Sequence, residues 1–408
     1  MPGSAPAGSD AAGDRGAGAR IVIVGAAGFT NLGDDAILTA MLAELRLAVP
    51  GARFVVAGGA PDEIAASYCV EAVAVRDIRA VDAALARADL AIVGGGGFIF
   101  DYDGIISPYD FLRGDITYMF PYYRAALCAR ARDVPVYFYA VGVDSLVTPA
   151  GRALTRDVLS LASAITVRDP LSLFELRAAG VRSPLVEVTA DPAVRIPPPQ
   201  GRWDARPSGR VVAFVVRPWL RFAGEWTSSA AQYFERYVSW IAAAADHVVD
   251  RWDATPVFVA GQRYSDDDLD VARRVVSAMR QPERGLVVPE VEDEEQYRAA
   301  FSGADIVVST RLHPLILAAT AGVPVVGLAA GEKVRAFLGP LGLEGQVVSP
   351  WAASTEKLRI AVDVALGDHG TIRETMRTGV ERQRAAAARN PEIAAELLGL
   401  RRAAVTTS

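Results

Sequence analysis

Residues 21–51, IVIVGAAGFTNLGDDAILTAMLAELRLAVPG, contain the pattern on which the fold depends. Ile21–Gly25 is a short apolar run that ends in glycine, which is typical of a buried parallel strand. After a glycine-containing loop, apolar side chains keep helical spacing at Ile37, Leu38, Met41, Leu42 and Leu45. Pro50 and Gly51 then end the predicted helix. This order of strand, loop and helix predicts the first unit of an α/β fold.

The same alternation continues along the chain in two sets. Further strands of the first set are predicted at 54–59, 90–97, 134–142 and 164–169. Strands of the second set are predicted at 211–219, 255–262, 286–289, 305–310 and 323–329. The proline-rich segment RIPPPQGRWDARPSG, residues 195–209, is expected to link the two sets. We therefore expect two Rossmann-like, doubly wound parallel-sheet lobes with a cleft between them, where ligands bind at the carboxyl ends of the strands.

This pattern divides the chain into four parts. Residues 1–19 contain almost no large apolar side chains, so a disordered tail is expected there. The remaining parts are an N-terminal lobe at 20–200, a C-terminal lobe at 201–350 and C-terminal helices at 351–408.

Composition excludes several classes of protein. The chain has 408 residues, of which 51% are hydrophobic and 22% charged, which is incompatible with a wholly disordered chain or a coiled coil. The net charge of −6 lacks the basic excess of a general nucleic-acid binder. Two cysteines cannot form a disulfide framework, and the three histidines are too far apart in sequence to predict a metal cluster.

Targeting and membrane signals are also missing from the sequence. The N-terminal residues lack the apolar region of a signal peptide. The longest apolar stretch, 312–331, is interrupted by Pro314, Gly322 and Pro324, so no integral membrane segment is predicted. The expected location is the cytoplasm.

Two arginines and a histidine follow strands of the second set. Arg311 and His313 belong to STRLH, residues 309–313, where a helix is predicted to begin. Free N–H groups and the positive end of the helix dipole attract anions there. Arg217 follows another strand and adds a second planar guanidinium. These groups are predicted to hold a small dianion or trianion; the alternative is that Arg311 pairs with a neighbouring acid and His313 only caps the helix.

The loop after the first strand is acidic. Asn31, Gly33, Asp34 and Asp35 lie where the first helix begins, in a pattern that is neither a dinucleotide-binding fingerprint nor a P-loop. Two carboxylates at this position would repel an anion. We therefore expect the N-terminal lobe to take an uncharged, hydroxyl-rich ligand, unless the acids only cap the helix.

Glycines and aromatic residues follow the strand at 90–97. GGGG at 94–97 permits close approach of a ligand, which makes Gly96 and Gly97 candidate contacts. Asp101 and Asp103 come next, and they are followed by the aromatic residues Tyr102, Tyr109, Phe111, Tyr118, Phe120, Tyr122 and Tyr123. Such a set suits carbohydrate rings and hydroxyls, whereas the alternative for Tyr122 and Tyr123 is a core helix. Gln262 and Lys333, each following a strand, are further candidates at the cleft.

Taken together, these segments resemble the polysaccharide pyruvyl transferase family. The matching segments run in the expected order from about residue 20 to 345. They are GFxNxGD(D/E)AI near the start, GGGG followed by Asp101, VGV at 141–143, TVRD at 166–169, TADP at 189–192, VRPW at 216–219, Gln262 and STRLH at 309–313. The resemblance implies a two-lobed, GT-B-like transferase. Such an enzyme moves an enolpyruvyl-derived unit from phosphoenolpyruvate to two hydroxyls of a sugar or other polyol, forming a ketal and releasing phosphate, without a metal or nucleotide cofactor.

The resemblance also suggests roles for single residues. Arg217 and Arg311 are expected to hold the two anionic groups of phosphoenolpyruvate, with His313 as the general acid. Asp101 or Asp34 is expected to take the proton from the acceptor hydroxyl. The remaining expected substrate contacts are Asn31, Gly33, Gly96, Gly97, Gln262, Leu312 and Lys333.

Three alternatives remain open at this point. The first is a nucleotide-sugar glycosyltransferase of the same shape. It is disfavoured because no acid for a ribose lies between Arg311 and Gly331. The second is a non-catalytic relative that binds a glycan, and the third is a family member recruited to tailor a secondary metabolite.

Overall fold

The computed structural model describes residues 18–101, 119–182, 186–218, 228–262, 266–288, 291, 293–351 and 354–406. Most of the expected N-terminal tail lies outside the described residues. So do five of the residues named above, Tyr102, Asp103, Tyr109, Phe111 and Tyr118.

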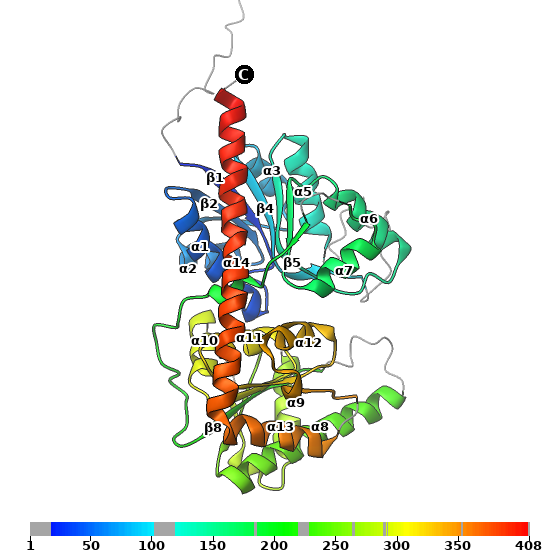
Figure 1. The fold of residues 1–408 in the computed structure, drawn as a ribbon, viewed down its shortest axis with the longest axis vertical. Helices are drawn as coiled ribbons and strands as arrows, with labels where there is room; N and C mark the ends of the chain where they lie inside the picture. Colours follow the sequence, from blue (N-terminus) through cyan, green and yellow to red (C-terminus); the bar gives the residue numbers. More distant parts are fainter. Residues whose placement is uncertain are drawn as a thin grey trace, which may run out of the picture.

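Two parallel sheets form the framework of the molecule (Figure 1). The first has the order β3-β2-β1-β4-β5-β6-β7 and the second the order β10-β9-β8-β11-β12-β13. The strands of the first sheet are β1 (Arg20–Val24), β2 (Arg53–Gly58), β3 (Glu71–Ala74), β4 (Leu90–Ile99), β5 (Val136–Val143), β6 (Ala164–Val167) and β7 (Val186–Val188). Those of the second are β8 (Val211–Val215), β9 (Thr255–Val259), β10 (Leu286–Val288), β11 (Ile306–Ser309), β12 (Val325–Leu328) and β13 (Val347–Val348). Two doubly wound lobes are therefore confirmed.

Helices connect the strands and cover the sheets. In the first lobe they are α1 (Leu32–Ala48), α2 (Pro61–Tyr68), α3 (Ile78–Leu85), α5 (Phe120–Ala131), α6 (Pro149–Leu159), α7 (Pro170–Ala178) and the 3-10 helix η1 (Pro192–Arg195). In the second they are α8 (Ser228–Trp252), α9 (Asp266–Ser277), η3 (Pro282–Arg284), α10 (Glu294–Ser302), α11 (Leu312–Thr320), α12 (Glu332–Leu338), η4 (Gly339–Leu341) and η5 (Glu344–Gln346). The chain ends with α13 (Thr355–Gly367) and α14 (His369–Thr406). No helix among the described residues is both long and apolar enough to cross a bilayer.

The structure contains every strand predicted from the sequence and adds three more. The additions, β3, β7 and β13, each lie at the edge of a sheet. Edge strands are short and bury fewer side chains, and β3 and β7 accordingly contain no fully buried residue. They therefore lack the apolar run by which the central strands could be predicted.

The last helix joins the two lobes. Figure 1 shows α14 running along both lobes, and it contacts α1 and β5 of the first and α11 and α13 of the second. Its fully buried Asn390 accepts hydrogen bonds from the hydroxyls of Thr166, at 2.7 Å, and Thr189, at 2.8 Å. Because a buried amide is costly to leave unpaired, these bonds fix the ends of β6 and β7. Arg168 and Asp191 follow those ends directly.

Candidate functional site

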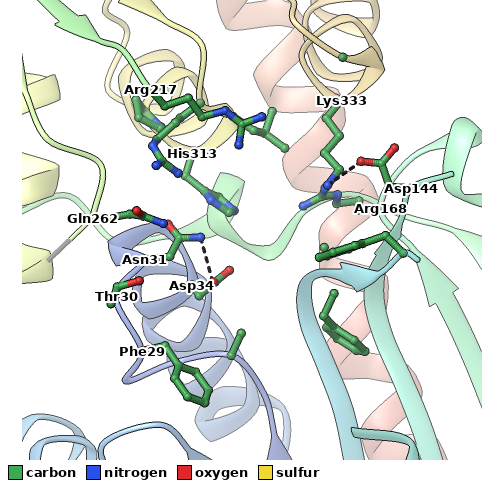
Figure 2. Close-up of a pocket in the computed structure, with 18 of the residues that line it drawn as sticks. Phe29, Thr30, Asn31, Asp34, Asp144, Arg168, Arg217, Gln262, His313 and Lys333 are labelled. Atoms are coloured by element: carbon green, nitrogen blue, oxygen red, sulfur yellow. Dashed lines mark hydrogen bonds and ion pairs between the residues drawn. The ribbon is translucent and has the colours of Figure 1, made fainter. Parts of the chain in front are cut away.

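A cavity of about 730 Å³ lies between the lobes, at the carboxyl ends of both sets of strands (Figure 2). Its first-lobe wall comes from the segments that follow β1, β3, β5 and β6, from β4 itself and from the start of α5. Its second-lobe wall comes from the segments that follow β8, β9, β11 and β12. Among the described residues, no group of three or more His, Cys, Asp or Glu side chains is arranged to hold a metal ion.

His313 enters the first lobe from the second. It lies in the first turn of α11, whose N-cap, Arg311, makes no capping hydrogen bond with its side chain. The imidazole packs against Gly33, where a Cβ atom would overlap its ring. The His313 side chain is nine-tenths buried, and its Nε2 has no hydrogen-bond partner among the described residues. A side chain at position 33 would overlap the imidazole, so this position of His313 requires glycine there.

Asp191 and Arg168 of the first lobe lie close to His313. Asp191 Oδ2 is 3.8 Å from His313 Nε2, beyond hydrogen-bond distance, and 3.0 Å from Arg168 Nη1. Burial would raise the pKa of Asp191, but His313 and Arg168 lower it to about 2. Asp191 is therefore an anion that faces the imidazole. Asp191 lies in the TADP segment quoted above, where no sequence pattern distinguishes it from its neighbours.

Arg168 reaches the cavity through a gap between strands. A Cβ atom on Gly142 would lie 2.5 Å from the carbon of its guanidinium group, and one on Gly97 would lie 3.0 Å from its Nη2. Glycine at both positions therefore gives this guanidinium its path to the cavity, which it lines. The sequence placed Arg168 after a strand, where a structural role was the simpler interpretation. The structure shows both a structural ion pair and exposure to the cavity.

Asp34 and Asn31 lie opposite His313, at the start of α1. Asn31 caps the helix by accepting from Gly33 N, and its Nδ2 donates to Asp34 Oδ2 at 2.9 Å. Burial raises the pKa of Asp34 to about 6, although His313 and the hydrogen bond from Asn31 oppose the shift. A carboxylate with such a pKa can act as a base near neutral pH. Asp35, by contrast, is buried and accepts a hydrogen bond from Gly28 N, so it does not face the ligand.

Two contacts join the lobes across the cavity. Asn31 and Gln262 form an antiparallel backbone bridge, which brings both predicted residues to the cavity. Lys333 Nζ forms an ion pair with Asp144 Oδ2 at 2.9 Å (Figure 2). Burial and the nearby Arg168 and Arg217 lower the pKa of Lys333, whereas Asp144 opposes them. Lys333 is therefore a cavity residue rather than a surface lysine.

The two predicted arginines both line the cavity. Arg217 lines the cavity, and its side chain extends toward the open space beside His313 (Figure 2). Arg311 also lines the wall, but its Nε and Nη2 each donate to Asp268 at 2.8 Å. Since this double hydrogen bond occupies the fork of the guanidinium, Arg311 is already paired, as the alternative interpretation expected. The pairing with Asp268 gives Arg311 a structural role, and the prediction that it also holds an anion of the donor stays a prediction.

Asp101, a predicted catalytic acid, is hydrogen-bonded to the segment before α6. Its Oδ1 accepts from Val147 N, and its Oδ2 accepts from the backbone N at 2.8 Å and from the hydroxyl of Thr148. The carboxylate is buried and does not line the cavity, so it secures the start of α6. Gly96 does not line the cavity either, whereas Gly97 and Leu312 do.

The two tyrosines of the predicted aromatic stretch have different environments. Tyr123 is fully buried, and its hydroxyl bonds to Thr155, as expected of a core helix. Tyr122 lines the cavity and packs on Phe98, with ring centroids 4.2 Å apart.

Comparisons with known proteins agree with this architecture. The family model described as polysaccharide pyruvyl transferase matches residues 31–331. No curated protein sequence matches the chain. Among solved structures, the UDP-GlcNAc 2-epimerase from Neisseria meningitidis bound to UDP-GlcNAc superposes with a TM-score of 0.58 at 13% identity, over 93% of this chain and 99% of that one.

Two further solved structures share the arrangement. The UDP-GlcNAc 2-epimerase from Methanocaldococcus jannaschii has a TM-score of 0.57 at 10% identity, over 88% of this chain and 98% of that one. The calicheamicin glycosyltransferase CalG4 has a TM-score of 0.52 at 16% identity, over 95% and 99%. At these identities the likeness concerns the fold, which is of the GT-B type.

Proposed function

The chain belongs to the polysaccharide pyruvyl transferase family and is a transferase, and we propose that it moves a pyruvyl unit from phosphoenolpyruvate to two hydroxyls of a sugar or other polyol. The products are a ketal and phosphate. One observation carries the proposal: His313 lies between the cationic side chains Arg217 and Lys333 and the carboxylate of Asp34, all in one cavity. We assign the acceptor to the lobe of residues 20–200 and the donor to the lobe of residues 201–350. The helices at 351–408 connect the two. Both described cysteines are free, which suits the reducing cytoplasm as the location.

The donor is placed by charge. Phosphoenolpyruvate has a phosphate and a carboxylate on a three-carbon frame. Arg217 and Lys333 of the second lobe and Arg168 of the first all line the cavity, so they can surround these two groups. The first turn of α11 adds its N–H groups and the positive end of the helix dipole. In this proposal Lys333 and Arg168 join Arg217 at the donor, and Arg311 is assigned mainly to its ion pair with Asp268.

His313 supplies the proton that starts the reaction. Proton transfer to the methylene carbon C3 of the donor leaves positive charge on C2 and its ester oxygen. The carboxylate of the donor and the anionic Asp191 near the imidazole offset the charges that develop. One acceptor hydroxyl attacks C2 while Asp34 takes its proton. The bond between C2 and the phosphate oxygen then breaks, and the second hydroxyl adds to C2. His313 takes the proton of this second hydroxyl and so recovers the one it gave to C3, and the proton held by Asp34 leaves with phosphate.

The role of Asp34 predicts a pH dependence. A base acts when it is ionised, and the pKa of Asp34 is raised to about 6. We therefore expect kcat/KM to rise as the pH increases through about 6 and to fall about tenfold for each unit below it. A pH series measured by phosphate release tests this. The acidic limb should disappear from the residual activity of Asp34→Asn, and a limb that persists unchanged in that variant would exclude Asp34 as the base.

The donor itself is tested by product analysis. Phosphate release from phosphoenolpyruvate is measured over a panel of hydroxyl compounds, and nucleotide release is measured from UDP-sugars and GDP-sugars with the same panel. We expect acceptor-dependent phosphate release and no release of UDP or GDP. Release of a nucleotide without phosphate from phosphoenolpyruvate would favour a glycosyltransferase. Binding of acceptors without turnover of either donor class would favour a non-catalytic relative.

A matched pair of lysine variants localises the donor. Lys333→Ala should weaken binding of phosphoenolpyruvate on the order of tenfold to a hundredfold, because it removes a charge-assisted contact. Lys357→Ala changes an exposed lysine on α13 that does not line the cavity, and it should leave binding unchanged. Calorimetric titration measures both. Equal affinity of the two variants would show that the donor does not reach Lys333.

A further inference from the structure

The cavity is larger than the donor requires. Phosphoenolpyruvate has about ten non-hydrogen atoms, and even at the ~30 Å³ that one water occupies in the liquid it would fill less than half of 730 Å³. The donor's cationic groups lie at the end formed by the second lobe and Arg168. The remaining space extends into the first lobe, along the carboxyl ends of β4, β1 and β3.

Aromatic side chains form part of the wall of this remaining space. Phe29 from the loop after β1, Phe98 from β4 and Tyr122 from α5 all line it. Phe98 and Tyr122 form a tilted pair at 4.2 Å and are both at least nine-tenths buried, so their positions are fixed by packing. Flat, rigid side chains of this kind stack on the apolar face of a sugar ring.

Arg76 is the cation at this end of the cavity. It follows β3, is exposed, and lies with its guanidinium carbon 5.3 Å from the centroid of the Phe29 ring. Within the described part of the chain it forms no ion pair with a carboxylate, whereas Arg168, Arg311 and Lys333 each do. Stacking on Phe29 holds the guanidinium at the wall and leaves its N–H groups for a ligand.

Tyr122 is influenced electrostatically by both Arg76 and the proposed base, Asp34. Burial raises the pKa of its phenol, Asp34 raises it further and Arg76 lowers it. Both charges thus act on this one ring. Asp34, Arg76 and Tyr122 all line this cavity, so a ligand that lies on Tyr122 is near both charges.

We infer that the first-lobe half of the cavity is the acceptor subsite, and that it takes a sugar carrying an anionic group. The ring packs on Phe29 and Tyr122, its reacting hydroxyls face Asp34, and its carboxylate or phosphate contacts Arg76. This inference rests on the proposed function for the identity of the other substrate. It also amends the expectation of an uncharged ligand, which came from Asp34 and Asp35 and took no account of Arg76. In this arrangement the acceptor's hydroxyls face Asp34, and its anionic group contacts Arg76.

Binding of three matched sugars tests the inference without the donor. The probes are methyl glucoside, methyl glucuronide and glucose 6-phosphate, titrated by calorimetry in excess inorganic phosphate, which occupies the cationic donor end. We expect the full chain to bind one or both anionic sugars on the order of tenfold to a hundredfold more tightly than the neutral one. Preference for the glucuronide identifies a carboxylate as the anion, and preference for glucose 6-phosphate identifies a phosphate ester.

Variants identify the residue that causes the preference for anionic sugars. Arg76→Gln should abolish it while leaving the affinity for methyl glucoside unchanged. Arg79→Gln alters a neighbouring exposed arginine on α3 that does not line the cavity, so it should keep the preference. Phe29→Leu should weaken all three sugars and weaken the anionic ones more, because it removes both a stacking surface and the ring that holds Arg76.

Two outcomes would overturn the inference. The first is equal binding of all three sugars by the unmodified chain. The second is a preference that survives in Arg76→Gln, or that is lost instead in Arg217→Gln, which would place the anion at the donor end. Since phosphoenolpyruvate is absent from these titrations, a failure of the proposed donor would appear in the phosphate-release assay and not here.

Discussion

His313→Ala should lower the rate of phosphate release with phosphoenolpyruvate and acceptor by ~10²–10⁴-fold, the usual contribution of a general acid. The imidazole lies against the first lobe at Gly33 and also lines the cationic cavity. The substitution removes the proton donor and keeps Arg217 and Lys333. Binding of phosphoenolpyruvate should therefore fall much less than kcat does. Rate and binding are measured by phosphate release and by calorimetry.

Gly33→Ala is the companion variant for this prediction. It keeps the imidazole but introduces a methyl group that would overlap the ring, so His313 must move. A displacement of this kind costs up to about 10²-fold in rate. Circular dichroism and thermal unfolding serve as the control that both variants are folded. Phosphate release by folded His313→Ala at the rate of the unmodified protein would exclude the acid role, whatever the result for Gly33→Ala.

The sequence was sufficient for the fold because central strands are apolar runs. The runs at 21–25, 90–97 and 305–310 are each buried on both faces of a parallel sheet, which leaves a strong signal in composition. Edge strands carry no such signal. The position of functional residues after strands followed from the same pattern, and it correctly brought Asp34 and His313 to one cavity.

Partnership between distant residues could not be predicted in the same way. Nothing local in the sequence distinguishes Arg217, which extends into the cavity, from Arg311, which pairs with Asp268 from another helix. Asp101 likewise looked like a cleft acid, and its partners, at 147 and 148, lie beyond a whole strand and helix. How many donors of a charged side chain are left for a ligand depends on how many of them nearby groups already bind, and that depends on tertiary contacts.

The same reasoning explains why Arg168 and Arg76 were not predicted. Arg168 is usable because two glycines on neighbouring strands leave it a path, and those glycines become neighbours only in the folded sheet. Arg76 gains its role from Phe29, which is 47 positions earlier in the chain and reaches it across the order β3-β2-β1. In both cases the sheet, rather than the local sequence, creates the site.

Arg311→Ala should destabilise the protein by about 3–5 kcal/mol, because it leaves the buried carboxylate of Asp268 without its partner. The Asp268 side chain is 0% exposed, and it also accepts a hydrogen bond from Gly261 N at 3.0 Å. One amide donor cannot offset the burial of a charge. The loss is measured by urea unfolding followed through intrinsic fluorescence.

The double variant Arg311→Ala, Asp268→Ala separates the two roles that Arg311 could have. If the arginine is structural, removing both charges should recover much of the stability that the single variant loses, since no unpaired ion remains. Affinity of the folded Arg311→Ala protein for phosphoenolpyruvate should then change less than it does in Lys333→Ala. A variant that is as stable as the unmodified chain but no longer binds phosphoenolpyruvate would contradict this. It would restore Arg311 to the anion site, and the ion pair with Asp268 would then be one that the donor displaces.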